Sequence, residues 1–206
     1  MYQVHNLHGY KIYLNENESP MMKARVKSSY EPLKFKWLKS NLTHNDVFVD
    51  VGANKGDFTL LAALYCNKVY SVEPHPENLK WLTESISLND FNNVEVLAGC
   101  ATNNAGTVEL GVGSMSGHHS ITAKRHSHIT VDAFRLDEKI KEKSLVVKID
   151  VEGAEKLVLE GMSNIMRNVR AFLIDVDSGD HVGVKNFLSE FDIITHANRE
   201  LICIRY

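Results

Sequence analysis

Apolar residues recur along the chain in two patterns, and together they predict strands that alternate with helices. Short apolar runs bounded by acids or turn residues are typical of buried strands, and apolar residues three and four positions apart are typical of helices. The predicted strands are Val47–Val51, Lys68–Val72, Val94–Ala98, Leu145–Ile149, Ala171–Ile174 and Leu201–Ile204. The predicted helices are Glu31–Leu42, the segment after Gly56, Pro76–Leu88, Val131–Lys141, Gly153–Asn168 and Val182–Phe191. This alternation requires crossover connections, so we expect an α/β fold with a mainly parallel, doubly wound sheet.

Two segments depart from this alternation. Tyr2–His5 and Tyr10–Leu14 predict a small N-terminal hairpin, and residues 100–130 are short, polar and glycine-rich, which predicts a hairpin and loop insertion. We expect one domain over residues 1–206, with the hairpin and first helix in residues 1–42 and the core in residues 43–206.

Composition narrows the class of protein. The formal charge of the 206 residues is −3, which argues against a nucleic-acid partner or a membrane surface, since both favour a basic face. The three cysteines are widely spaced and form no disulfide framework, and no apolar run approaches the ~20 residues of a membrane span. The N-terminal residues are polar and contain no apolar signal segment. We therefore expect a cytoplasmic protein that acts on a small molecule and can form a homo-oligomer.

Acidic residues stand at the ends of four predicted strands, where α/β sheets bind their ligands. These residues are Asp50, Glu73, Asp150 and Asp175. The turn after the first of these strands contains Gly52 and Gly56, but a dinucleotide fingerprint would need glycines where Asn54 and Asp57 stand. The turn is therefore poorly suited to a phosphate and better suited to a cationic ligand such as S-adenosylmethionine, whose ribose Glu73 would bind.

Four motifs carry a resemblance to a known family. DVGANKG (Asp50–Gly56), VEPHPENL (Val72–Leu79), HITVDAF (His128–Phe134) and KIDVEGAE (Lys148–Glu155) resemble the FkbM-type methyltransferases, which are S-adenosylmethionine-dependent O-methyltransferases. The resemblance implies a Rossmann-like class I methyltransferase sheet with an antiparallel last strand. The residues then expected to bind the cofactor are Asp50, Gly52, Ala53, Asn54, Gly56, Glu73, Pro74, Ala101 and Asp150.

Methyl transfer to a hydroxyl requires alignment of the two reactants and removal of a proton. We expect Asp150 to orient or deprotonate the acceptor hydroxyl, and the alternative is that Asp150 caps the helix that begins near Gly153. His118 and His119 are further candidates for catalysis or acceptor contact. The spacing of the histidines matches no zinc pattern, so no metal site is predicted.

The acceptor is expected to be a hydroxyl on a sugar or another small metabolite. Its candidate contacts are Tyr30, Glu152, Glu155 and Asp175, although Glu155 is equally suited to a capping role at its own helix. Two alternatives stay open. One is a sugar-nucleotide or dinucleotide enzyme on the same sheet, since Asp175 and Asp177 resemble a metal-binding DxD pair. The other is a non-catalytic domain that binds S-adenosylmethionine.

Overall fold

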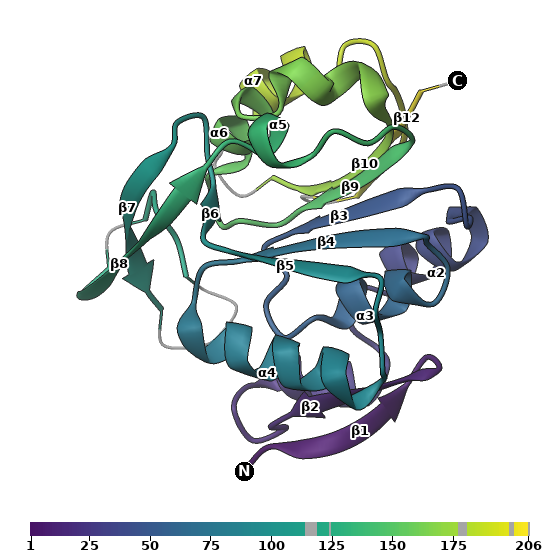
Figure 1. Cartoon of the computed structure of the whole chain (residues 1–206), viewed down its shortest axis with the longest axis vertical. Coiled ribbons are helices and arrows are strands. Elements are labelled where there is room, and N and C mark those ends of the chain that lie inside the picture. The colour runs from purple at the N-terminus through teal and green to yellow at the C-terminus, as the bar shows by residue number, and fades with distance from the viewer. Residues whose placement is uncertain (114–118, 124, 177–180, 198–199, 206) are drawn as a thin grey trace.

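A seven-stranded sheet forms the centre of the protein (Figure 1). The computed structural model describes residues 1–205 except 114–118, 124, 177–180 and 198–199. The strand order is β11-β12-β10-β9-β3-β4-β5. The bounds are β3 Val47–Val51, β4 Lys68–Glu73, β5 Val94–Ala98, β9 Leu145–Ile149, β10 Val169–Asp175, β11 Asp192–Ala197 and β12 Glu200–Ile204. Strand β12 runs antiparallel to both of its neighbours and the other pairs are parallel, which confirms the predicted sheet.

Helices cover both faces of this sheet (Figure 1). Helices α2 (Pro32–Asn41), α3 (Asp57–Ala63) and α4 (Pro76–Leu88) lie on one side, and α5 (Leu136–Lys139), α6 (Glu155–Glu160), the 3₁₀ helix η1 (Ser163–Asn168) and α7 (His181–Phe187) lie on the other. Strand β3 shows how the residues divide: Val49 and Val51 join one hydrophobic cluster, and Phe48 joins the other. Alternate side chains point to opposite faces, so a strand covered on both sides has apolar residues on both faces.

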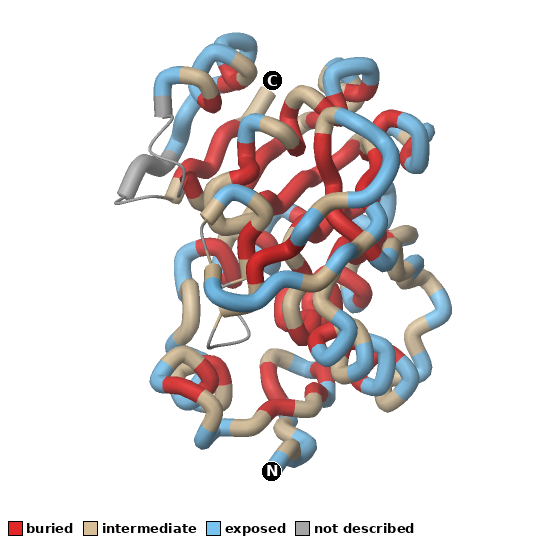
Figure 2. Tube along the Cα trace, turned by 90° about the vertical axis from the view of Figure 1, so that its left-hand side faces the viewer, coloured by how far each residue is buried: buried red, intermediate tan, exposed pale blue. Residues whose placement is uncertain are grey.

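The N-terminal segment packs against the α3 and α4 side of the sheet. Strands β1 (Gln3–Leu7) and β2 (Tyr10–Leu14) form the predicted hairpin, and Ile12 and Leu14 are fully buried in the same cluster as Leu60. Helix α1 (Pro20–Val26) follows and was not predicted; its N-cap Ser19 accepts a hydrogen bond from the Met22 amide at 3.2 Å. Figure 2 shows buried segments through the interior of the trace and exposed ones along its outer loops.

The insertion after β5 forms a second small sheet. It contains β6 (Cys100–Ala101), β7 (Gly106–Val112) and β8 (Ser127–Phe134) in the order β6-β8-β7, and the antiparallel β7–β8 pair confirms the predicted hairpin. The predicted helix over residues 131–141 is wrong in its first half. Residues 131–133 pair with β7 and Phe134 pairs with Ala101 of β6, so pairing with neighbouring strands overrides their helical pattern.

Two other predicted helices are shorter than expected. The helix predicted over residues 153–168 divides into α6 and η1 at Gly161, where an added Cβ would lie 1.9 Å from the carbonyl oxygen of Thr102. Helix α7 ends at Phe187 rather than residue 191. Among the described residues, no helix combines the length and the apolar character that a membrane crossing needs.

Candidate functional site

Two cavities adjoin at the carboxyl ends of β3, β4 and β9, and both are lined by Gly52 and Asn54. The first has about 550 Å³ of empty space and the second about 750 Å³, in each case partly open to solvent. The first is lined by Val51, Gly52, Asn54, Val72, Glu73, Pro74, Asn78, Gly99, Cys100, Ala101, Leu110, His119, Ser120, Ile121, Val151 and Ala154. The second is lined by Met21, Arg25, Tyr30, Glu31, Gly52, Ala53, Asn54, Asp57, Phe58, Lys148, Asp150, Glu152 and Asp175.

The turn between the cavities is shaped by contacts within the protein. Gly52 has φ 80°, and an added Cβ would lie 1.9 Å from the carbonyl oxygen of Asp150. Gly56 has φ 98°, and its added Cβ would lie 2.6 Å from a Leu82 methyl carbon. Gly56 lines neither cavity. The need for a glycine at this position is therefore explained by its close packing on α4 rather than by the expected cofactor contact.

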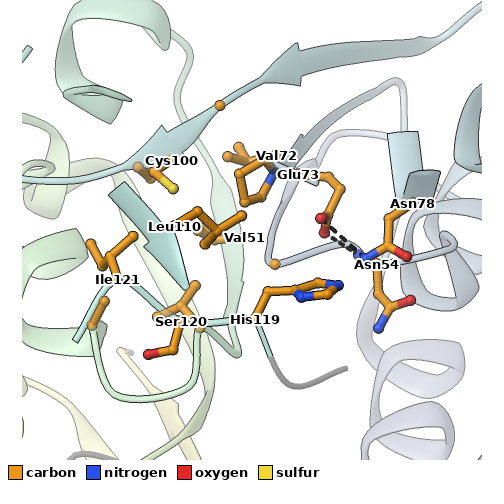
Figure 3. A pocket seen from close by; sticks show the side chains of 16 residues that line it. Val51, Asn54, Val72, Glu73, Asn78, Cys100, Leu110, His119, Ser120 and Ile121 are labelled. Carbon is orange, nitrogen blue, oxygen red and sulfur yellow. Dashed lines mark hydrogen bonds between the residues drawn. The ribbon is translucent and has the colours of Figure 1, made fainter. Parts of the chain in front are cut away.

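Glu73, at the end of β4, is a buried carboxylate in the wall of the first cavity (Figure 3). One of its oxygens accepts a hydrogen bond from the Asn54 amide at 2.8 Å. The other accepts from the His75 amide at 2.9 Å and from the Asn78 side chain at 3.2 Å. Burial raises the pKa of Glu73 to about 7 despite these donors.

The remaining walls of the first cavity are mainly apolar. Pro74 and Ala101 line it as expected, together with the larger apolar side chains Val51, Val72, Leu110 and Ile121. Flat apolar walls around one buried carboxylate suit an adenosine group, because the base packs on apolar side chains and the ribose hydroxyls donate to the carboxylate. The residues present therefore fit the cofactor that the sequence predicts.

His119 lies in this first cavity and not in the cavity that holds Asp150. Its ring stacks on His75 with the ring centres 4.0 Å apart, and Figure 3 shows it on the same side as Asn54. Its Nδ1 accepts a hydrogen bond from the Gly113 amide at 3.2 Å. This position favours contact with the cofactor over the predicted catalytic contact with the acceptor. His118 lies outside the described residues.

Asp50 is fully buried and lines neither cavity. It accepts a hydrogen bond from the Thr59 hydroxyl at 2.7 Å and lies 3.3 Å from the Lys148 ammonium. Lys148 also donates to the Gly52 carbonyl at 2.9 Å and lies 3.6 Å from Asp150. Asp50 therefore holds Lys148 beneath the turn. Because Asp50 is itself buried there, it cannot make the direct contact with a cofactor that the sequence predicted.

Asp150 lies in the second cavity with two other acids. Carboxylate oxygens of Glu31, Asp150 and Asp175 lie within 4.8 Å of one another, close enough to hold a cation. The Lys34 ammonium contacts both Glu31, at 3.2 Å, and Asp175. Burial raises the pKa of Asp175 to about 6, although Lys34 opposes this shift. Lys34 and Lys148 supply the positive charge that three adjacent carboxylates require. Asp177 lies outside the described residues.

The capping alternatives resolve differently for the two acids of this loop. Helix α6 begins at Glu155 with Ala154 as its N-cap, so Asp150 is not its cap. Glu155 is fully buried, lines neither cavity and accepts a hydrogen bond from the Gly153 amide at 2.8 Å, which favours its capping role over acceptor contact. Glu152 does line the second cavity, and its carbonyl accepts from the Ser120 hydroxyl at 2.6 Å.

Several residues that line the two cavities were not predicted from the sequence, among them Asn78, Glu31 and Arg25. Asn78 lies within the motif VEPHPENL and Glu31 directly follows Tyr30, a predicted acceptor contact, so the positions of both residues were a usable signal. Arg25 of α1 carries no such signal, yet its guanidinium lies 4.7 Å above the ring of Tyr30, a predicted acceptor contact that also lines the second cavity. Burial alone would lower the pKa of Arg25, but Asp57 and Tyr30 outweigh burial and raise it.

Comparison with known proteins identifies related chains. A family model described as "Methyltransferase FkbM domain" matches residues 50–194. The Hexuronic acid methyltransferase AglP of Haloferax volcanii is 28% identical over 164 residues, which are 76% of this chain and 68% of that protein.

Solved structures share the fold. The methyltransferase FkbM from Methylobacillus flagellatus gives a TM-score of 0.59 at 19% identity, over 89% of this chain and 52% of that one, so this chain spans about half its length. A putative methyltransferase from Streptococcus mutans, solved in complex with SAH, gives a TM-score of 0.53 at 13% identity, over 84% of this chain and 94% of that one. The fold is that of the class I methyltransferases.

Proposed function

The chain belongs to the FkbM methyltransferase family, and on this premise we propose that it is an S-adenosylmethionine-dependent O-methyltransferase. The acceptor is a hydroxyl on a sugar or another small molecule. The observation that carries the proposal is the pair of cavities that share Gly52 and Asn54, with buried Glu73 in one and Asp150 in the other.

The first cavity is the proposed cofactor site. In this proposal the Glu73 carboxylate accepts hydrogen bonds from the ribose hydroxyls, and the neighbouring apolar side chains enclose the adenine. The bound cofactor supplies an activated methyl group on a sulfonium. The family and the fold support this cofactor, and so does the related structure solved in complex with SAH.

Asp150 is the proposed residue that orients the acceptor hydroxyl and takes its proton. Its carboxylate lines the second cavity, beside the turn shared with the cofactor cavity, and is partly exposed. Lys148, which Asp50 holds in place, fixes Asp150 from below through the 3.6 Å ion pair. Alignment of the hydroxyl with the methyl group and exclusion of water lower the barrier by ~7–11 kcal/mol in well-ordered systems.

A sugar acceptor is supported by two observations. The relative AglP is described as a hexuronic acid methyltransferase, and hexuronic acids are sugars. The second cavity of this chain carries several carboxylates, among them those of Glu31, Asp150 and Asp175, and carboxylates accept hydrogen bonds from sugar hydroxyls.

The test combines binding with turnover. S-adenosylhomocysteine affinity is measured by calorimetry, and methylation is measured across a panel of neutral and acidic sugars. Asp150→Asn should abolish turnover while S-adenosylhomocysteine affinity is retained, and Glu190→Gln, at an acid whose side chain is 79% exposed, is the matched control. An active Asp150→Asn enzyme would rule out the role of Asp150. Binding of S-adenosylhomocysteine without turnover on any hydroxylated acceptor would favour a non-catalytic domain.

A further inference from the structure

A buried ion pair, between Arg25 and Asp57, lies in the wall of the second cavity, which the three adjacent carboxylates also line. Arg25 comes from α1 and Asp57 from the start of α3, and their side chains are each only 5% exposed. The Arg25 Nη1 and the Asp57 Oδ2 are 3.1 Å apart. Both residues line the cavity next to Ala53 and the shared turn.

This pair retains unused hydrogen-bonding capacity. Within the described part of the chain, Arg25 Nε and Nη1 and Asp57 Oδ2 have no hydrogen-bond partner, although each atom is buried. Buried polar atoms are usually hydrogen-bonded, and an unsatisfied one costs about 1–3 kcal/mol. Tyr30 lies under the guanidinium plane at 4.7 Å and restricts its orientation. The arrangement leaves donors on Arg25 and an acceptor on Asp57 for a bound group.

We propose that Arg25 and Asp57 bind the α-amino acid group of the cofactor, Arg25 through the carboxylate and Asp57 through the ammonium. The inference rests on the proposed function, because it needs the adenosine group in the first cavity. From there the methionyl chain passes the shared residues Gly52 and Asn54 and ends in the second cavity. The opposite charges of the pair match the opposite charges of a zwitterion.

A carboxylate on the acceptor is the competing occupant, and the pair fits it less well. A lone carboxylate would gain hydrogen bonds from Arg25 but would also lie close to the negative charge of Asp57, because the Asp57 Oδ2 is only 3.1 Å from the Arg25 Nη1. A zwitterion satisfies both residues and adds no net charge to a buried position.

The test compares two ligands that differ in the amino acid group and in the one methylene that joins it to the rest of the thioether chain. S-adenosylhomocysteine carries the amino acid group, and 5′-methylthioadenosine carries the same adenosine and a thioether without it. The double variant Arg25→Gln/Asp57→Asn removes both charges and leaves neither one buried alone. Calorimetry should show S-adenosylhomocysteine affinity reduced roughly 10- to 100-fold, the range for lost charge-assisted hydrogen bonds, with methylthioadenosine affinity within about threefold.

Two further variants keep the test decisive. Arg205→Gln/Glu190→Gln removes an exposed ion pair of 2.7 Å and should leave both affinities unchanged. If the double variant does not fold, as judged by its melting curve, Arg25→Lys retains the charge but loses the bidentate geometry. It should weaken S-adenosylhomocysteine alone, by roughly 3- to 10-fold.

The outcomes separate this inference from the proposed function. A wild-type protein that does not bind S-adenosylhomocysteine refutes the proposed function itself. If the wild type binds S-adenosylhomocysteine but the ratio of the two affinities is the same in the variants, the assignment of Arg25 and Asp57 is overturned. This includes the case in which both affinities fall equally. The assignment is also overturned if the ratio is unchanged and only the preference for an acidic over a neutral sugar acceptor is lost.

Discussion

The buried carboxylate of Glu73 should make the protein less stable as the pH rises from about 4.5 to about 7. Burial raises its folded-state pKa from 4.5 to about 7, because the surrounding apolar walls disfavour the charge more than its three donors favour it. The unfolded chain loses the proton near the ordinary value. Between these two pH values the folded state holds a proton that the unfolded state has lost, so the free energy of unfolding falls with increasing pH.

The magnitude follows from the size of the shift. Each pKa unit corresponds to about 1.4 kcal/mol, so the shift from 4.5 to about 7 corresponds to a loss of about 3 kcal/mol across this window. Glu73→Gln removes the titrating group. The difference in unfolding free energy between wild type and variant should therefore change by about 3 kcal/mol between about pH 5 and about pH 8, whatever constant offset the lost hydrogen bonds add.

Urea denaturation of both proteins at these two pH values measures the effect. Asp175, whose pKa burial raises to about 6, also destabilises the wild type in this range, and the comparison with Glu73→Gln cancels that contribution. Glu142 is the matched control. Burial alone would raise the pKa of Glu142, but the hydrogen bond from the Tyr70 hydroxyl helps to lower it. Glu142→Gln should therefore change the free energy of unfolding by the same amount at both pH values. Parallel profiles for wild type and Glu73→Gln would refute the reasoning.

Three further outcomes follow from packing and charge at the site. Gly52→Ala should destabilise the protein by at least ~2 kcal/mol in urea denaturation, because its Cβ would meet the Asp150 carbonyl 1.9 Å away; a neutral substitution would contradict this. Lys148→Met should cost about 3–5 kcal/mol by leaving Asp50 buried without its cation, and the double variant with Asp50→Asn should recover most of that stability. His119→Ala should weaken S-adenosylhomocysteine binding about 3- to 10-fold in calorimetry, whereas lost turnover at unchanged affinity would indicate a catalytic role instead.

The strands of the central sheet were predictable where both faces are covered. Runs such as Val47–Val51 and Leu145–Ile149 are buried throughout, so each strand is apolar except for one charged residue, Asp50 or Lys148. Strand β11 was missed because it lies at the sheet edge, where Ile193 and Ile194 are each 44% exposed and consecutive. No alternation marks it. The helix predicted after residue 130 was wrong for a different reason. That segment is a strand because it pairs with β7, and the local sequence does not show this pairing.

The position of the candidate site was predictable from the strand ends, but which acids line its cavities was not. Asp50 and Glu73 both stand at strand ends, yet only Glu73 lines a cavity. In the register of the sheet Asp50 lies beside Lys148, so their opposite charges meet across neighbouring strands. That register depends on which strands become neighbours. Asp50 and Lys148 are almost a hundred positions apart, so the sequence around either residue does not show that they meet.

The two buried groups with incomplete partners lie on opposite sides of the turn at Gly52. On one side Glu73 keeps a raised pKa although three N–H groups contact it, and on the other Arg25 and Asp57 form an ion pair but retain buried polar atoms without a hydrogen bond. Burial of each group has a free-energy cost that its contacts within the described part of the chain offset only in part. A single ligand with hydroxyls at one end and a zwitterion at the other would compensate for both. If that reasoning holds, saturating S-adenosylhomocysteine should stabilise the wild type more than 5′-methylthioadenosine does, and should flatten the pH dependence assigned to Glu73.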